Sequence, residues 1–203
     1  MDLVRNEKVI HIALPDEEKY ERKNQKVIDE VKYYVDKYPR VELLSIGTEK
    51  KVSEWNQEYG VPEADGFDHQ NSNGWCNYDG CKASIVISDE RYKSIYIWGA
   101  KRGSLLYKTV EGKYTNDVQG IKRFKNGLCI ETLLAHEFMH AIDSAYQIYE
   151  NSRVIGEYEK HAHEFEDIHE FIAECYTASE FVEGNKYADK IRVMIDEIIE
   201  NNN

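Results

Sequence analysis

Three features that would assign a chain to a familiar class are missing from this sequence. Basic residues are outnumbered, with 26 Lys and Arg against 38 Asp and Glu, so the basic surface of a nucleic-acid-binding protein is not expected. No apolar run approaches the roughly 18 residues of a membrane-spanning helix. The charged amino end, MDLVRNEKVI, lacks the apolar core of a signal peptide, so we expect either a cytoplasmic protein or the mature form of a secreted one.

Cysteine is also scarce, with four in the chain. Cys76 and Cys81 are five positions apart and can pair in a disulfide, but as metal ligands they lack the second pair of a zinc knuckle. Cys129 and Cys175 lie in apolar, helical surroundings, and we expect them to be buried free thiols. The sequence does not decide whether Cys76 and Cys81 are bonded.

The residues that are present describe a packed globular protein. Hydrophobic residues make up 41% of the 203 residues and aromatic residues 12%, which suffices for a core in one domain. The net charge of −12 mainly favours solubility, although it also suits cationic peptide partners. We expect a single domain over residues 1–203, and a monomer.

The amino-terminal half predicts a small sheet that carries a helix. Residues 8–14 and 41–46 are short, β-prone runs. Between them, residues 16–37 place apolar side chains at helical spacing, and Pro39 ends the pattern. Strand, helix and strand in this order predict a right-handed crossover onto a small sheet.

Further along, two more apolar runs, at 83–88 and 94–98, predict strands. Residues 60–81 are rich in Gly, Asp and Asn and predict a long loop, and residues 101–126 are polar and irregular. From Leu128 onward the pattern is helical.

Three helices are expected in that last part, at about 128–147, 167–183 and 187–199. The whole chain is therefore predicted to be α+β, with the sheet in an amino lobe over 1–126 and a mainly helical lobe over 127–203.

The sequence His136-Glu137-Phe138-Met139-His140 is an HExxH motif. On a helix, residues four apart lie one turn apart on the same face, so both imidazoles can reach one ion. Zinc suits two neutral histidines and a carboxylate, with the fourth position left for water. Glu137 is then placed to take a proton from that water. The opposite face of the helix carries an apolar stripe that can be buried, formed by Leu134, Phe138, Ala141 and Ala145.

The third ligand must come from another part of the chain. Glu170 and Glu174 lie four apart on one helical face among apolar residues. We assign Glu170 as the ligand and Glu174 as the partner of a ligating histidine, and the main alternative exchanges the two. A further alternative uses His161, His163 or His169, although His161 and His169 are more typical of surface residues on a charged linker.

Asp143 shares the angular position of the two motif histidines but lies too far along the helix to reach the same ion. Two interpretations remain open for it. It can fix a histidine or cap the pocket, or it can be an ordinary solvated aspartate.

These motifs resemble a known family. HEFMHAID followed about 30 residues later by EFIAE is similar to the catalytic domain shared by anthrax lethal factor and the clostridial Pro-Pro endopeptidases, a gluzincin-type family of zinc metalloproteases. The opening strand, helix and strand, and the segment Gly60-Val61-Pro62 before a tryptophan-bearing loop, also resemble it. The resemblance covers most of the chain and is weakest between residues 88 and 126.

The resemblance implies a zincin-like fold with an active-site cleft between the two lobes, and one zinc ion held by His136, His140 and Glu170. It implies Glu137 as the catalytic residue and an aromatic substrate contact at Trp75. A secreted location and a preference for proline near the cleaved bond also follow from it.

One position departs from the family. Seven residues before the glutamate ligand the family has a tyrosine that stabilises the tetrahedral intermediate, whereas this chain has His163. An imidazole N–H can serve as the donor, so we expect His163 in this role. Two alternatives stay open: Tyr158 is the donor, or the donor is missing and the enzyme is slow.

The sequence therefore predicts a zinc-dependent endopeptidase acting on a protein or peptide. Zinc would polarise the carbonyl and activate the water, Glu137 would move the proton, and the edge of the strand at 83–88 would hold the substrate extended. Two alternatives remain: a cytoplasmic regulatory protease with one protein substrate, and a zinc-binding interaction module of the same fold with little or no activity.

Overall fold

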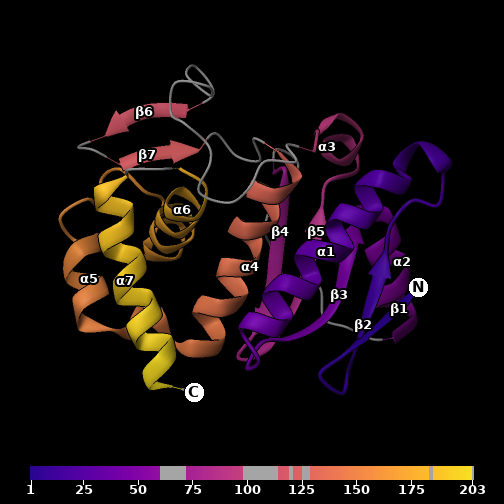
Figure 1. Ribbon diagram of the computed structural model, residues 1–203, viewed down its shortest axis with the longest axis horizontal. Helices are drawn as coiled ribbons and strands as arrows, with labels where there is room; N and C mark the ends of the chain where they lie inside the picture. Colours follow the sequence, from indigo (N-terminus) through magenta and orange to yellow (C-terminus); the bar gives the residue numbers. More distant parts are fainter. Residues whose placement is uncertain (60–71, 98–113, 119–120, 125–128, 183–184, 203) are drawn as a thin grey trace.

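The computed structural model describes residues 1–59, 72–97, 114–118, 121–124, 129–182 and 185–202 (Figure 1). Its helices and strands alternate in the first part of the chain, and helices predominate in the last. In chain order the elements are β1 Asp2–Arg5, β2 Lys8–Ala13, the 3₁₀ turn η1 Glu18–Tyr20, α1 Glu21–Lys37, β3 Glu42–Thr48, α2 Glu49–Tyr59, β4 Gly74–Asp79, β5 Lys82–Ile87, α3 Asp89–Ser94, β6 Tyr114–Val118, β7 Ile121–Phe124, α4 Ile130–Tyr146, the 3₁₀ turn η4 Ile148–Glu150, α5 Ser152–Tyr158, α6 Ile168–Phe181 and α7 Lys186–Asn201.

A five-stranded mixed sheet forms the amino-terminal part, with strand order β1-β2-β3-β5-β4. The central strands β2, β3 and β5 are parallel, while β1 and β4 pair antiparallel at the two ends of the sheet. Because α1 joins the parallel neighbours β2 and β3, the predicted crossover and the α+β class are confirmed.

Three strand predictions need correction. Residues 83–88 were expected at a sheet edge, but β5 is an inner strand because β4 pairs along its whole length. That same β4 lies inside the predicted loop 60–81, whose residues 60–71 fall outside the described part of the chain. The strand expected at 94–98 is absent over its described residues, since α3 ends at Ser94 and residues 95–97 follow without a strand.

The two faces of the sheet carry different layers. Ile12 and Ile85 point toward the main core together with the apolar side of α1, which crosses in front of the strands in Figure 1. Their sequence neighbours Ala13 and Val86 point the other way and pack against Val52 of α2. This alternation places α1 and α2 on opposite faces of the sheet.

The carboxyl-terminal helices extend the same core. α4 packs beside α1, and the ring of Phe138 stacks on Tyr34 with 4.6 Å between centroids. α6 packs on α4, and α7 packs on α6 through buried residues that include Ile191 and Ile195. The predicted apolar stripe of α4 is confirmed, because all four of its residues are buried. One apolar cluster therefore runs from β2 to α7.

Several smaller features complete the fold. β6 and β7 pair antiparallel, and β7 lies beside α6 (Figure 1). Both strands fall within residues 101–126, which were predicted to be irregular, and within residues 1–126, which were predicted to form the amino lobe. All four cysteines are free, and Cys129 and Cys175 are buried as expected. Within the described part of the chain, no helix has the length and apolar character needed to cross a membrane.

Candidate metal centre

The helix α4 presents its two motif histidines on one side and buries the other. Its start is fixed by Cys129, whose backbone N–H donates to Thr132 Oγ1, and its end by Gln147 in the left-handed conformation, with φ of 54°. Between these ends the helix is regular, so His136 and His140 lie one turn apart. Their Nε2 atoms are 3.1 Å from each other.

The helix α6 brings the third group. The side chain of Asp167 accepts a hydrogen bond from the backbone N–H of Glu170 at 2.9 Å, which caps the helix and places Glu170 in its first turn. Glu170 Oε2 then lies 3.4 Å from His136 Nε2, and Oε1 lies 3.3 Å from His140 Nε2. Among the described residues, these three form the one group of His, Cys, Asp and Glu side chains whose ligand atoms converge.

The donor set and its dimensions fit zinc. Zinc bonds nitrogen and oxygen at about 2.0–2.2 Å, so the ligands of a tetrahedral ion are about 3.3–3.5 Å apart. The two Nε2 atoms are 3.1 Å apart, and each lies 3.3–3.4 Å from its nearest Glu170 oxygen, Oε1 for His140 and Oε2 for His136, so the separations are near these values. Two imidazoles and one carboxylate leave a fourth position open, as catalytic zinc sites do.

The charges at the site are strongly coupled. Burial alone would lower the pKa of His136, but its hydrogen bond with Glu170 and the charges of Glu137 and Glu170 raise it to about 9. Burial would raise the pKa of Glu170, but its hydrogen bonds with His136 and His140 hold it well below the usual range. The cluster therefore attracts positive charge to its centre, as a proton or as a metal ion.

Glu137 lies on the sheet side of the centre. It is 4% exposed, and burial raises the pKa of its carboxyl group. A Cβ atom built on Gly74 of β4 would lie 3.6 Å from Glu137 Oε1, so the absence of a side chain there makes room for the carboxylate. A buried carboxylate with a raised pKa beside a polar centre is suited to proton transfer.

Asp143 connects the two ligand-bearing helices. It is 1% exposed, accepts a hydrogen bond from the backbone N–H of Tyr149 at 2.9 Å, and its Oδ2 lies 2.6 Å from His169 Nδ1. The solvated interpretation of Asp143 is therefore wrong. Since His169 precedes Glu170 on α6, this contact ties α4 to the turn that carries Glu170.

The two glutamates of α6 take different positions. Glu170 has both oxygens at the imidazoles, whereas Glu174 is buried one turn further along the helix. The charge of Glu174 contributes to the raised pKa of His136. This geometry favours Glu170 over Glu174 as the third group.

The other predicted histidines are not brought to the centre. The side chain of His163 is 72% exposed, and its Nε2 lies 3.4 Å from Glu164. His161 is buried against Tyr187, with 4.9 Å between ring centroids, so its expected surface position is wrong. His169 is likewise not a free surface residue, because its ring is paired with Asp143. The ring of Tyr158, the alternative donor, packs against Phe171 at 5.8 Å.

Trp75 also lies away from the centre. It is in β4 opposite Val86 and packs with the cluster that α2 covers, on the face of the sheet turned away from α4. Its neighbours Gly74 and Cys76 point to the other face, toward α4, as Tyr78 does further along; the charge of Glu137 acts on the Cys76 thiol.

Sequence reasoning missed this strand beside the site. β4 runs along α4, with Gly74 near Glu137 and, toward its other end, Tyr78 near His169 at 6.4 Å between ring centroids. The alternation of Trp75, Asn77 and Asp79 with the α4-facing residues was the available signal.

A scan against protein-family models finds none that matches this chain, and searches of curated proteins and of solved structures also find no match.

Proposed function

We propose that this chain is a zinc-dependent endopeptidase with a zincin-like fold, as its resemblance to the Pro-Pro endopeptidase family implies. The observation that carries the proposal is the convergence of His136, His140 and Glu170 at zinc-ligand spacing, with Glu137 buried beside them. An HExxH helix with a carboxylate from a second helix is a donor set typical of such hydrolases.

Each residue then has a defined task. His136, His140 and Glu170 would hold one zinc ion, which supplies Lewis acidity toward the scissile carbonyl and lowers the pKa of water. Glu137 accepts the proton of the attacking water and returns it to the leaving nitrogen. Burial raises the pKa of Glu137, which makes its carboxylate a stronger base toward the water and leaves it able to pass the proton on to the leaving nitrogen.

The substrate is proposed to bind as an extended strand. Within the described residues β4 ends the sheet, and it runs beside α4, so its outer edge is the pairing partner that we propose close to Glu137. The sequence predicted this role for the strand at 83–88. We assign it to β4 instead, because β5 lies between β3 and β4 in the sheet. A preference for proline and a cleft between the lobes stay predictions from the resemblance.

One observation favours a second candidate, a zinc-binding interaction module with little activity. The predicted oxyanion donor His163 is mostly exposed and its contact is with Glu164. A site without a donor for the tetrahedral intermediate would be slower by about 10²–10³-fold.

The two candidates are separated by digesting a diverse peptide library and identifying the products by mass spectrometry. The zinc-loaded proteins to compare are the wild type, Glu137→Gln and the control Glu159→Gln, which changes an exposed carboxylate after α5. We expect cuts by the wild type and the control, and a loss of about 10²–10⁴-fold for Glu137→Gln.

The other outcomes are equally informative. If all three proteins bind one zinc and none cuts, the interaction module is supported. If Glu137→Gln cuts as fast as the wild type, Glu137 is not the base and the proposed mechanism is wrong. The residues around each cut report the proline preference.

A further inference from the structure

A second place in the fold has the layout of a ligand site, far along the chain from the zinc-ligand residues. The chain leaves β2 for α1 on one face of the sheet, and it leaves the parallel neighbour β3 for α2 on the other face. Where adjacent parallel strands send their connections to opposite faces, a crevice opens outside their carboxyl ends, and ligands of open α/β sheets bind there.

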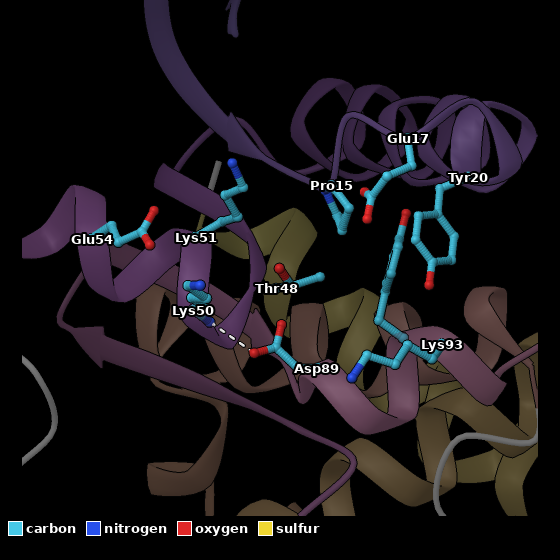
Figure 2. A pocket seen from close by; sticks show the side chains of 10 residues that line it. Pro15, Glu17, Tyr20, Thr48, Lys50, Lys51, Glu54, Asp89 and Lys93 are labelled. Atoms are coloured by element: carbon cyan, nitrogen blue, oxygen red, sulfur yellow. Dashed lines mark hydrogen bonds between the residues drawn. The ribbon is translucent and has the colours of Figure 1, made fainter.

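A cavity of about 310 Å³ occupies this crevice (Figure 2). Its walls come from the residues that directly follow the three parallel strands: Pro15 after β2, Thr48 and Lys50 at the end of β3, and Asp89 after β5. The cavity therefore coincides with the position that the topology marks. Its volume is at the small end of the range for pockets that enclose small molecules.

The floor and the apolar wall are built from ordered groups. Thr48 is 1% exposed and lies at the centre of the ring of side chains in Figure 2, so its position is set by the sheet. The rings of Tyr20 and Tyr92 lie 5.6 Å apart between centroids and line one side. Asp89 is the first residue of α3, and its carboxylate lies against the start of α2: Oδ2 accepts a hydrogen bond from the backbone N–H of Lys50 at 3.3 Å.

The charged lining contains both signs in equal number. Three ammonium groups and three carboxylates surround the opening, from Lys50, Lys51, Lys93, Glu17, Glu54 and Asp89. A site for a simple anion would be dominated by donors, and a site for a metal cation by carboxylates. The two signs are interspersed around the opening, since α2 carries Lys50, Lys51 and Glu54 and α3 carries Asp89 and Lys93. A lining that offers both signs within a short distance complements a small molecule that itself carries both.

We propose that this cavity binds a small zwitterion with the chemistry of a free amino acid or a dipeptide. The ammonium group of the ligand would lie among the carboxylates and its carboxylate among the lysines, with Thr48 as a hydrogen-bonding partner and the tyrosines against its apolar part. This proposal does not depend on the zinc site, since none of the cavity residues belongs to α4 or α6.

The test is a titration of the ¹⁵N-labelled full chain with glycylglycine, in which binding is monitored through the NMR chemical shifts of the backbone amides. Two capped analogues, N-acetylglycylglycine and glycylglycinamide, each remove one charge of the zwitterion, and inorganic phosphate serves as a simple anion. We expect saturable shifts at the start of α2 and in α3, with affinity at least about tenfold lower for each analogue. The resonances of the peptide itself report whether it stays intact.

Variants locate the site. Thr48→Val, which nearly keeps the shape of the side chain, and Lys50→Gln are expected to weaken glycylglycine binding by about tenfold. Lys82→Gln is the matched control, because Lys82 is an exposed lysine at the opposite end of β5. The amide spectrum of each variant shows directly whether it is folded.

Three outcomes would overturn the proposal. The first is that the dipeptide and both capped analogues bind equally well. The second is that phosphate shifts the same amides and binds more tightly than the dipeptide. The third is that the dipeptide shifts only amides of α4 and α6. The last would indicate that the peptide binds at the zinc-ligand residues, so a failure here leaves the proposed endopeptidase activity untouched.

Discussion

At the scale of single residues, burial separates the exposed thiol of Cys81 from the other three thiols. Burial, together with the charge of Glu137, raises the pKa of the Cys76 thiol well above its ordinary value, and burial raises the pKa of Cys129 to about 12. Cys175 is fully buried, whereas Cys81 is exposed in the turn between β4 and β5. The thiolate is the reactive form, so these shifts suppress reactivity in the folded protein.

We therefore expect iodoacetamide at pH 8 to modify Cys81 selectively. Peptide mass spectrometry after a timed reaction would measure the modified fraction at each position, and unfolding in urea should make all four cysteines react alike. Similar labelling of Cys76 and Cys81 in the folded chain, or a disulfide between them, would contradict the structure.

At the scale of elements, the contact between β4 and α4 positions the proposed base, and it requires a residue without a side chain. A Cβ atom on Gly74 would lie 2.8 Å from the carbonyl oxygen of Val86 and 3.4 Å from a methyl carbon of Leu133. The backbone of β5 cannot yield without disturbing the sheet, so any substitution forces β4 outward.

Gly74→Ala is expected to lower the free energy of unfolding by about 1–3 kcal/mol because of this overpacking. Gly156→Ala is the control: it lies in α5 with open space around it, and alanine should stabilise the helix by about 0.5–1 kcal/mol. Urea unfolding of both variants measures the two values. A neutral Gly74→Ala would mean that β4 and α4 are less closely packed than described.

A second contact between elements depends on pH. Glu157 of α5 lies 2.6 Å from Lys160 and 2.8 Å from Lys190 of α7, and these hydrogen bonds lower its pKa to about 2. A carboxylate with a lowered pKa contributes stability above its unfolded pKa of about 4.5 and loses that contribution as the pH falls toward 2.

The difference in unfolding free energy between the wild type and Glu157→Gln should therefore be largest above pH 5 and shrink between pH 4.5 and 2. Chemical denaturation of both proteins across this range, with the metal removed, gives the difference directly. A constant difference over the whole range would show that Glu157 does not hold α5 to α7 through its charge.

At the scale of the whole molecule, the proposed zinc ligands come from two helices that are distant in sequence. An ion held by both α4 and α6 would stabilise the folded chain, by an amount that grows with the logarithm of the ion concentration relative to its dissociation constant, because the unfolded chain does not keep the ligands together. Removal of zinc with a chelator should lower the thermal midpoint, and zinc at 1,000 times its dissociation constant should add about 4 kcal/mol. Scanning calorimetry of the wild type, Glu170→Gln and the control His163→Gln, which changes an exposed side chain, would test this. We expect zinc to raise the thermal midpoint of the wild type and of His163→Gln but not that of Glu170→Gln.

The parts that sequence reasoning predicted are those set by local periodicity. The spacing of His136 and His140 needs only a regular helix, and the crossover over residues 8–46 follows from the order of its apolar runs. Glu170 required one more step, the observation that apolar neighbours surround it, because its approach to the histidines depends on how α6 packs on α4.

The parts that it did not predict depend on pairing across the chain. β4 has few β-prone residues, and it is a strand because β5 offers it a partner along its whole length. The face of the sheet to which Trp75 points depends on the β5 residue with which it pairs, which is Val86. In the irregular segment before α6, nothing local distinguishes the buried His161 from the exposed His163.

The helix α1 has a consequence for motion. Tyr34 of this helix stacks on Phe138 of α4, and the hydroxyl of Tyr38, the residue directly after the helix, forms a hydrogen bond with the hydroxyl of Tyr176 of α6. A hinge between the sheet and the helices would have to break these buried contacts, so the two halves are expected to fluctuate and open as one cooperative unit. Amide hydrogen exchange of α1, α4 and α6 should then share one slow rate.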